Sequence, residues 1–294
     1  EGAIVKKAIA DYYGIREKEV FVGNGSDEVL GLLFKAFFDE TAAVAFPDIT
    51  YSFYPVYSNL FEIPFMRIPL KDDFSIEFGD YPDGVKAIVF ANPNAPTGIA
   101  VPVNEIEKLL KERPDTLIVV DEAYIDFGGE SCVPLISTYD NLIVVQTLSK
   151  SRALAGLRIG FAIGDESLME GLVRVKDSFN SYPLDSIAQV AAEAAFLDKR
   201  YFDGTWEKII RTREWSKERF KEMGAEVTDS KSNFLFVKIP GFTGPEALAQ
   251  LRQNGILVRN FKNPRISDWL RITVGTDDDM QKVVREVQKM MAGL

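Results

Sequence analysis

The chain has 294 residues and a formal net charge of −10, with 46% hydrophobic and 27% charged residues, which are the proportions of an ordinary globular protein. The acidic excess argues against a general nucleic-acid binder, whose surface must be basic to bind phosphates. The sequence contains no run of about 20 apolar residues, the length that a membrane helix needs. The chain has no histidine and one cysteine, Cys132. This composition excludes Ser-His-Asp and Cys-His catalysis, histidine-ligated zinc, CxxC metal sites and an intramolecular disulfide framework. We therefore expect no metal, a cytoplasmic protein, and proton transfer by Lys, Tyr, Asp, Glu or a cofactor.

The first two thirds of the chain alternate short apolar segments with amphipathic ones. Helical spacing predicts helices over Glu1–Gly14, Glu28–Phe38 and Val103–Glu112. The apolar segments predict strands at Val20–Val22, Ala42–Phe46, Ala87–Ala91, Leu117–Val120, Leu142–Gln146 and Ile159–Ile163. Because these runs of Val, Ile and Ala lack polar alternation, they are typical of strands buried on both faces of a mostly parallel α/β sheet.

Beyond Tyr182-Pro183 the pattern changes to longer helices and alternating strands. Helices are expected over Asp185–Leu197, Tyr201–Met223, Pro245–Asn254 and Asp277–Met291, and strands over Asn233–Ile239, Ile256–Val258 and Trp269–Val274. We therefore predict two domains, a large α/β domain of residues 1–182 and a small α+β domain of residues 183–294. The chain begins within a helical pattern, so we expect further sequence upstream of it.

The segment after the strand that ends at Gln146 is the first candidate site, because sites in open α/β sheets lie where strands end. It reads TLSKSRALAGLRIGF from Thr147 to Phe161. A lysine at a strand end, among hydroxyls and small residues, is expected to be partly buried and able to form a Schiff base. A surface turn is the alternative, but this polar pattern is longer than a turn requires.

The second candidate site is VVDEAY, which begins at Val119. A carboxylate at the end of a buried strand, such as that of Asp121, is costly unless it meets a cation. The alternative is that Asp121 caps the following turn. The sequence assigns no role to Glu122.

The third candidate site is VGNGSDE, between a strand and a helix. Gly25 allows close backbone approach, and the N-terminus of the following helix is suited to binding phosphate. The motif is not a dinucleotide-binding GxGxxG, because position 28 is Glu. The alternative is a helix capped by Ser26 or Asp27.

The fourth candidate region comprises DITYSFY, from Asp48, and NPNAPTG, from Asn92. In the C-terminal part, Arg259 and Arg271 stand at strand edges, where their planar guanidinium groups suit carboxylate or phosphate. For Tyr51 in isolation, a core position is the default interpretation, and for each arginine a solvated strand position is the alternative.

The string SKxxxLAGLRxG, from Ser149 to Gly160, resembles the lysine motif of fold-type I pyridoxal-phosphate aminotransferases, and most of all their histidinol-phosphate aminotransferase branch. The other motifs stand in the order of that family. The resemblance implies a large domain with a mostly parallel seven-stranded sheet flanked by helices, a smaller α+β C-terminal domain, a homodimer, and pyridoxal 5′-phosphate as cofactor. Members of the family also begin with an N-terminal arm, including an Asn-Pro-Tyr segment, which this sequence lacks.

The resemblance implies a role for each motif. Lys150 bonds the cofactor covalently and moves a proton between the substrate Cα and the cofactor C4′, Asp121 pairs with the pyridinium nitrogen, and Tyr124 hydrogen-bonds the cofactor's 3′-oxygen. Tyr51 stacks on the ring and Arg158 pairs with the phosphate. The remaining phosphate contacts fall to Gly25, Ser26, Asp27, Thr147 and Ser149. Where the family has an asparagine that also bonds the 3′-oxygen, this chain has Ala95, which leaves Asn94 or Asn92 to substitute, or Tyr124 to act alone.

For the substrate, the resemblance implies transamination of L-histidinol phosphate with 2-oxoglutarate in histidine biosynthesis. Arg271 and Arg259 would bind the substrate anions, with Asn180 helping to line the pocket. Three alternatives are an aromatic amino-acid aminotransferase, a phosphothreonine decarboxylase of the same fold, and a non-catalytic cofactor-binding regulatory protein. We expect no nucleic acid or membrane as partner.

Overall fold

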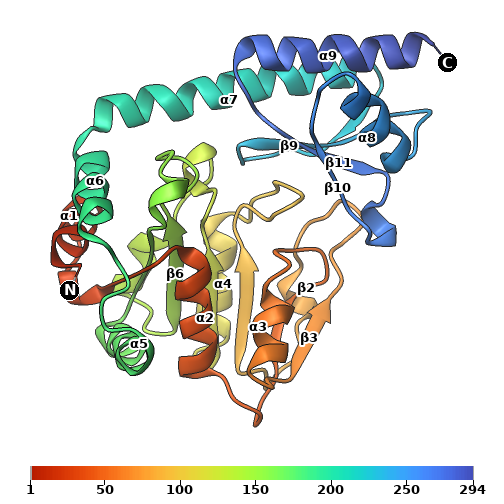
Figure 1. Ribbon diagram of the computed structural model, residues 1–294. Coiled ribbons are helices and arrows are strands. Elements are labelled where there is room, and N and C mark those ends of the chain that lie inside the picture. The colour runs from red at the N-terminus through yellow and green to blue at the C-terminus, as the bar shows by residue number, and fades with distance from the viewer. Residues whose placement is uncertain (1, 294) are drawn as a thin grey trace.

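A seven-stranded sheet forms the centre of the larger part of the molecule (Figure 1), in a computed structural model that describes residues 2–293. Its strand order is β1-β7-β6-β5-β4-β2-β3, and only β7 runs antiparallel to its neighbours. The strands are β1 (Val20–Gly23), β2 (Val44–Pro47), β3 (Phe65–Ile68), β4 (Ala87–Ala91), β5 (Leu117–Asp121), β6 (Leu142–Thr147) and β7 (Gly160–Gly164). The predicted mostly parallel seven-stranded sheet is confirmed, and its unpredicted member is the edge strand β3, which is less buried than the others.

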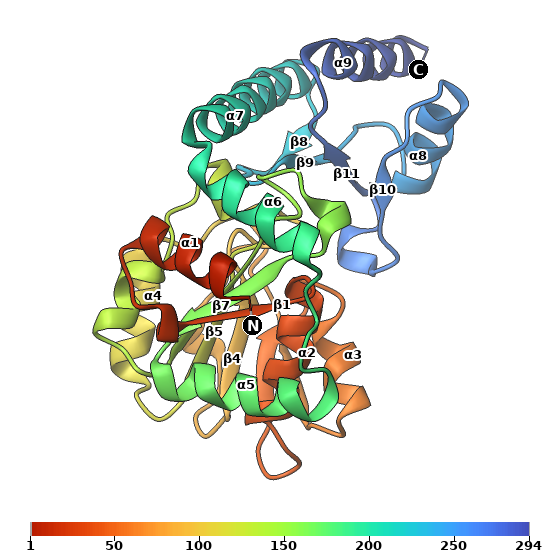
Figure 2. The ribbon, with the colours of Figure 1, turned by 60° about the vertical axis from the view of Figure 1, so that its left-hand side comes forward.

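Helices cover both faces of this sheet, because alternate side chains of a strand point to opposite faces. Phe21, Val89 and Val145 face one layer, and Val22, Phe90 and Val144 face the other. The first layer contains α2 (Ser26–Phe37), α3 (Tyr54–Leu60) and α5 (Glu166–Phe179), and the second contains α1 (Ala3–Tyr13), α4 (Val103–Glu112) and α6 (Ser186–Leu197). Figure 2 shows the sheet between these two layers.

The smaller unit has its own sheet and its own core. Its four antiparallel strands have the order β10-β11-β9-β8, and Phe220, Leu235 and Leu270 are fully buried in its core. Its elements are β8 (Glu226–Val227), β9 (Phe234–Lys238), β10 (Arg259–Asn260), β11 (Trp269–Thr273), α8 (Gly244–Gln253) and α9 (Asp277–Ala292). The long helix α7 (Lys199–Glu222) leads from α6 to this unit and runs alongside α9 (Figures 1 and 2). The division after residue 182 stays a prediction.

One predicted strand is wrong. Residues 256–258 form no strand, and β10 begins only at Arg259, where it pairs with Arg271 of β11. Leu257 is 79% exposed, because the chain after α8 has no neighbouring strand to pair with over residues 256–258. Three apolar residues in a row therefore indicated a strand where the backbone has no partner.

Short 3₁₀ segments connect the larger elements: η1 (Glu17–Glu19), η2 (Phe78–Asp80), η3 (Ile125–Phe127), η4 (Val133–Ser137), η5 (Ala155–Leu157) and η6 (Pro264–Ile266). Among residues 2–293, no helix is long and apolar enough to cross a membrane. The same residues contain no cluster of His, Cys, Asp and Glu that suits a metal ion.

Candidate active site

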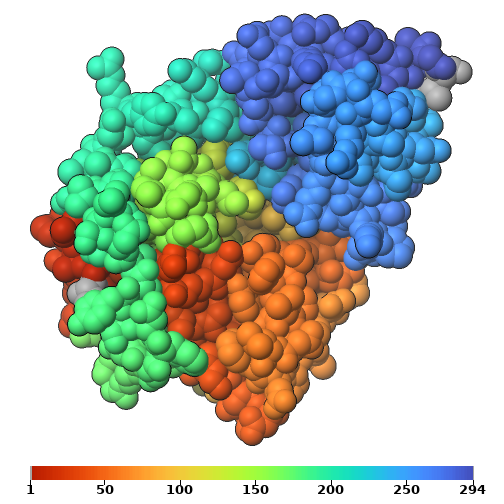
Figure 3. Space-filling view, in the orientation of Figure 1, coloured from red at the N-terminus to blue at the C-terminus, as the bar shows by residue number. Residues whose placement is uncertain are grey.

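A cavity of about 520 Å³ lies between the carboxyl ends of the central strands and the smaller unit. In Figure 3 the smaller unit, in blue, lies above the orange part of the large unit, which contains α3. The site residues predicted from sequence that line the cavity are Ser26, Asp27, Tyr51, Asp121, Tyr124, Ser149, Lys150, Arg158, Arg259 and Arg271. The structure thus brings together residues from segments up to 245 positions apart, because the strand ends of the large sheet face β10 and β11.

Asp121 is buried at the end of β5. Its Oδ2 accepts a hydrogen bond from the Tyr54 hydroxyl at 3.0 Å, and its Oδ1 accepts one from the Ala123 N–H at 3.1 Å. Burial raises the pKa of Asp121 to about 6, although both hydrogen bonds oppose the shift. The carboxylate has no ion-pair partner within the described part of the chain, so a cation placed opposite it would be strongly favoured.

Lys150 extends into the cavity beside Tyr124, with its Nζ 5.5 Å from the centroid of the Tyr124 ring. The side chain is exposed, so the expectation of partial burial is wrong, because the cavity between the two units is open around it. The loop after Lys150 is held in an unusual backbone conformation, since Ala153 and Arg158 have φ values of 55° and 52°. The left-handed conformation costs roughly 1–2 kcal/mol for a residue with a Cβ, and such strain is typical of functional loops.

A cup that suits an anion is formed where α2 begins next to Arg158. Helix α2 starts at Ser26, and its N-cap is Gly25, which offers no capping side chain, so the alternative of a Ser26 or Asp27 cap is wrong. Gly25 has a φ of +86°, and a Cβ there would lie 2.5 Å from Nη2 of Arg158. Gly160 is equally required, since its Cβ would lie 2.2 Å from the Ser26 nitrogen. The two glycines let the helix N-terminus, β7 and the guanidinium group converge where an anion would bind.

Tyr51 is linked to this cup through Asp27. The Tyr51 hydroxyl donates to Oδ1 of Asp27 at 2.7 Å, and Oδ2 of Asp27 lies 3.7 Å from Nη2 of Arg158. Burial and the nearby Asp27 carboxylate raise the pKa of Tyr51. The Tyr51 ring also meets the Tyr54 ring edge-on at 5.6 Å, so its position is fixed from two sides.

The two asparagines near Ala95 do not line the cavity, whereas Ala95 does. The Asn94 amide donates to the carbonyl oxygen of Ile49 at 2.9 Å, and its Oδ1 accepts from the Thr50 hydroxyl at 2.9 Å. The Asn92 side chain bonds to the backbone of the loop that follows it. Both amides hold loops in place here, and cofactor contact by either stays a prediction.

Three further predicted residues lie outside the cavity lining. Thr147 is buried behind it, and its hydroxyl donates to the Ile159 carbonyl oxygen at 3.1 Å. Gly25 contributes through its contact with Arg158. Asn180 is exposed at the end of α5, where its Oδ1 accepts from the Tyr182 N–H, and its role stays a prediction.

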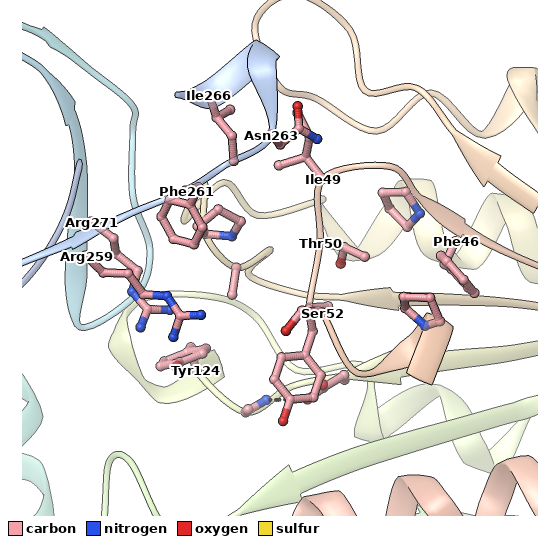
Figure 4. Close-up of a pocket in the computed structure, with 18 of the residues that line it drawn as sticks. Phe46, Ile49, Thr50, Ser52, Tyr124, Arg259, Phe261, Asn263, Ile266 and Arg271 are labelled. Atoms are coloured by element: carbon pink, nitrogen blue, oxygen red, sulfur yellow. Dashed lines mark hydrogen bonds between the residues drawn. The ribbon is translucent and has the colours of Figure 1, made fainter. Parts of the chain in front are cut away.

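Arg259 and Arg271 are direct cross-strand neighbours in β10 and β11. Figure 4 shows their guanidinium groups side by side and directed toward Tyr124. The Arg271 group lies 5.1 Å from the centroid of the Phe234 ring, and burial together with the charge of Arg259 lowers the Arg271 pKa. Neither guanidinium has a carboxylate partner in residues 2–293. Two adjacent unpaired cations of this kind suit a doubly charged anion.

Sequence reasoning missed Tyr54. Its side chain is fully buried and its hydroxyl reaches Asp121. The signal was present, because Tyr54 stands three residues after Tyr51, but nothing in the sequence separated the two tyrosines.

Comparisons with known proteins agree on one family. A model of the family described as aminotransferase class I and II matches residues 3–287. A histidinol-phosphate aminotransferase of Lactococcus lactis subsp. cremoris is 49% identical over 291 residues, which cover 99% of this chain and 82% of that protein. The crystal structure of histidinol-phosphate aminotransferase from Clostridium acetobutylicum has a TM-score of 0.92 at 21% identity, covering 100% of this chain and 90% of that one. That of the Sinorhizobium meliloti enzyme, in complex with pyridoxal 5′-phosphate, has a TM-score of 0.88 at 22% identity, covering 98% and 81%.

Proposed function

The chain belongs to the class I and II aminotransferase family, and from this premise we propose that it transfers the amino group of L-histidinol phosphate to 2-oxoglutarate in histidine biosynthesis. The relative from Lactococcus lactis, named histidinol-phosphate aminotransferase, supports the choice of donor. The single observation that carries the proposal is the convergence of Lys150, Asp121 and the Arg259–Arg271 pair on one cavity.

The residues of the cavity fit pyridoxal 5′-phosphate. The buried Asp121 carboxylate, without a cationic partner among the described residues, suits a protonated ring nitrogen. The cup at Gly25, Ser26 and Arg158 suits a phosphate dianion. Lys150 supplies an amine on the surface of the same cavity.

When bound, the cofactor supplies an electron sink that stabilises negative charge on the substrate Cα. Asp121 would hold the proton on the ring nitrogen, which would make the ring a better sink. Lys150 would accept the proton of the substrate Cα and return it at C4′, since its amine lies on the surface of the same cavity. Tyr124 would donate to the 3′-oxygen, Tyr51 would cover the face of the ring, and Arg158 would anchor the phosphate. Ser149 would complete the phosphate contacts, and Thr147, behind it, would support Ser149, whose N–H donates to the Thr147 hydroxyl at 3.2 Å.

The Arg259–Arg271 pair explains how one site serves both substrates in turn. The donor carries a phosphate monoester and the acceptor a distal carboxylate, and both are anions that a guanidinium fork binds well. No carboxylate of residues 2–293 neutralises these two guanidinium groups, which supports a preference for the dianionic donor. Asn180 is proposed to help line this region.

We also propose that two copies of the chain form a homodimer. An apolar surface along the end of α5 and the outer side of α6 supports it: Phe179, Tyr182, Ile187 and Leu197 are each at least 71% exposed. Several large apolar side chains exposed on neighbouring elements are typical of interaction surfaces. Sedimentation analysis tests the proposal, and a monomer at micromolar concentration would contradict it.

A cytoplasmic location is proposed from cysteine chemistry. Cys132, the one cysteine of the sequence, is a free, buried thiol. Such usage is typical of proteins in reducing compartments.

A donor screen tests the proposed function. Histidinol phosphate, phenylalanine, tyrosine and phosphothreonine are each offered with 2-oxoglutarate, and glutamate and carbon dioxide are measured. Histidinol phosphate should give the highest kcat/KM. A preference for phenylalanine or tyrosine would indicate an aromatic aminotransferase. Release of carbon dioxide from phosphothreonine would indicate a decarboxylase, and cofactor binding without any turnover would indicate a regulatory protein.

A further inference from the structure

Arg265 joins the smaller unit to the large sheet at the edge of the cavity. Its Nη1 lies 2.8 Å from Oδ2 of Asp48, a residue 217 positions away in the sequence. Its Nη2 donates to the carbonyl oxygens of Leu70 at 2.7 Å and Lys71 at 3.3 Å. One guanidinium group therefore binds two separate loops of the large unit, the one after β2 and the one after β3.

Asp48 is itself fixed firmly to the large sheet. Its Oδ1 accepts from the Leu70 N–H at 2.9 Å, and its own N–H donates to the Ile68 carbonyl oxygen at 2.9 Å. Asp48 stands only three residues before Tyr51, which lines the cavity. Arg265 consequently holds the first residue of the loop that places the Tyr51 ring.

The contact is partly shielded from solvent and has an apolar base. The side chains of Arg265 and Asp48 are 35% and 20% exposed, so salt screens their interaction less than that of a fully exposed pair. Beneath them, Ile266 packs in a buried cluster with Ile49 and Leu70. The ion pair thus orients a contact that hydrophobic burial already favours.

On the side of the smaller unit, Arg265 lies in η6, within the connection between β10 and β11. Those two strands carry Arg259 and Arg271. Asn263 accepts a hydrogen bond from the Arg265 N–H at 3.0 Å and lines the cavity. The segment that Arg265 anchors is therefore continuous with the proposed anion-binding pair.

We propose that Arg265 is a positioning residue, which sets the separation between the Tyr51 loop and the Arg259–Arg271 pair and thereby determines how tightly the substrate anions bind. The inference rests on the proposed function of the cavity. Arg265 touches neither the cofactor cup nor Lys150. Its loss should therefore weaken anion binding and leave the proton transfer at Cα largely unaffected.

The test compares Arg265→Met, Arg265→Lys, Asp48→Asn and the Arg265→Met/Asp48→Asn double variant with wild type, all loaded with cofactor. Arg174→Met is the matched control, because Arg174 makes an exposed ion pair with Glu170 on α5, at 2.6 Å. The measurements are kcat and KM for donor and acceptor, the dissociation constant of the cofactor, and the dissociation constant of inorganic phosphate by calorimetry. Phosphate binding needs no turnover, so it tests Arg265 even if the proposed donor fails.

In Arg265→Met and Asp48→Asn, the KM for both substrates and the dissociation constant for phosphate should rise about five- to tenfold. The kcat and the cofactor dissociation constant should stay within twofold of wild type. The double variant should be no worse than the poorer single variant, since both single variants already remove the Arg265–Asp48 ion pair, and Arg265→Lys should be intermediate. Additive effects, unchanged KM and phosphate binding, or a parallel loss of kcat and cofactor affinity would each overturn the inference. Wild-type protein that binds phosphate but turns over no histidinol phosphate would overturn only the proposed function.

Discussion

The hydroxyl of Tyr54 donates to Oδ2 of Asp121 at 3.0 Å inside the fully buried end of β5. Burial raises the pKa of Asp121 and this hydrogen bond lowers it, so Tyr54 keeps the carboxylate more acidic than its surroundings alone would. An ionised Asp121 is what a protonated pyridine nitrogen requires, so in the proposed site Tyr54 would act on the cofactor through Asp121.

Replacing Tyr54 by Phe should move the acidic limb of the pH profile to higher pH. Without the hydroxyl, burial is less opposed and the pKa of Asp121 rises above its value of about 6. A hydrogen bond to a charged group contributes about 1.5–3 kcal/mol, which corresponds to roughly one to two pKa units. Cofactor affinity and kcat/KM, measured from pH 5 to 9, should both show the shift. Tyr139→Phe is the control, since Tyr139 donates to the surface residue Glu107, and identical profiles for wild type and Tyr54→Phe would refute the role.

The raised pKa of Glu122 predicts that the free energy of unfolding depends on pH. It is buried and accepts hydrogen bonds from the Cys132 N–H, the Ser131 hydroxyl and the Gln146 amide, yet burial still raises its pKa from 4.5 to about 7. Because the pKa of Glu122 is higher in the folded than in the unfolded state, the protonated carboxyl contributes its full stabilisation of the fold below pH 4.5. That contribution is lost as the pH rises through 7. Glu122→Gln should therefore gain roughly 3 kcal/mol of unfolding free energy relative to wild type between pH 4.5 and 8. Urea unfolding at several pH values measures this difference, and a constant difference would contradict the assignment.

Lys150→Ala should abolish transamination and leave the cofactor bound without a covalent bond. Borohydride reduction followed by peptide mapping should place the cofactor of wild-type protein on Lys150. Lys262, the other lysine that lines the cavity, provides the control, because Lys262→Ala should retain the adduct. An adduct on any lysine other than Lys150 would disprove the assignment.

Arg158→Ala should weaken cofactor binding more than it slows catalysis. The variant removes a charge-assisted hydrogen bond to the phosphate, which contributes about 1.5–3 kcal/mol. Equilibrium dialysis should therefore show a loss of affinity of roughly tenfold to a hundredfold, with kcat at saturating cofactor reduced far less. Unchanged affinity would place the phosphate elsewhere.

The sequence predicted which residues line the cavity where these residues stand next to the end of a strand. Asp121, Lys150 and Arg158 line one cavity because β5, β6 and β7 are adjacent strands, and buried apolar runs reveal such strands. Arg259 and Arg271 were also identified, although the apolar run before Arg259 suggested a strand that the backbone does not form. Contacts that depend on tertiary packing could not be predicted in this way. Nothing in the sequence connects Arg265 to Asp48, and the exposure of Lys150 depends on how the two units enclose the cavity.

The most direct test of the account is the ratio of kcat/KM for histidinol phosphate to that for histidinol, in wild type and in Arg271→Met. A donor without a phosphate would cover the Arg259–Arg271 pair and leave both guanidinium groups without an anionic partner, so histidinol should be a far poorer donor for the wild-type protein. Arg271→Met should reduce the preference for the phosphate by at least tenfold and should also raise the KM for 2-oxoglutarate, since both anions use the same residue. A wild-type protein that uses histidinol or phenylalanine as well as histidinol phosphate, or an Arg271→Met variant with an unchanged ratio, would contradict the account.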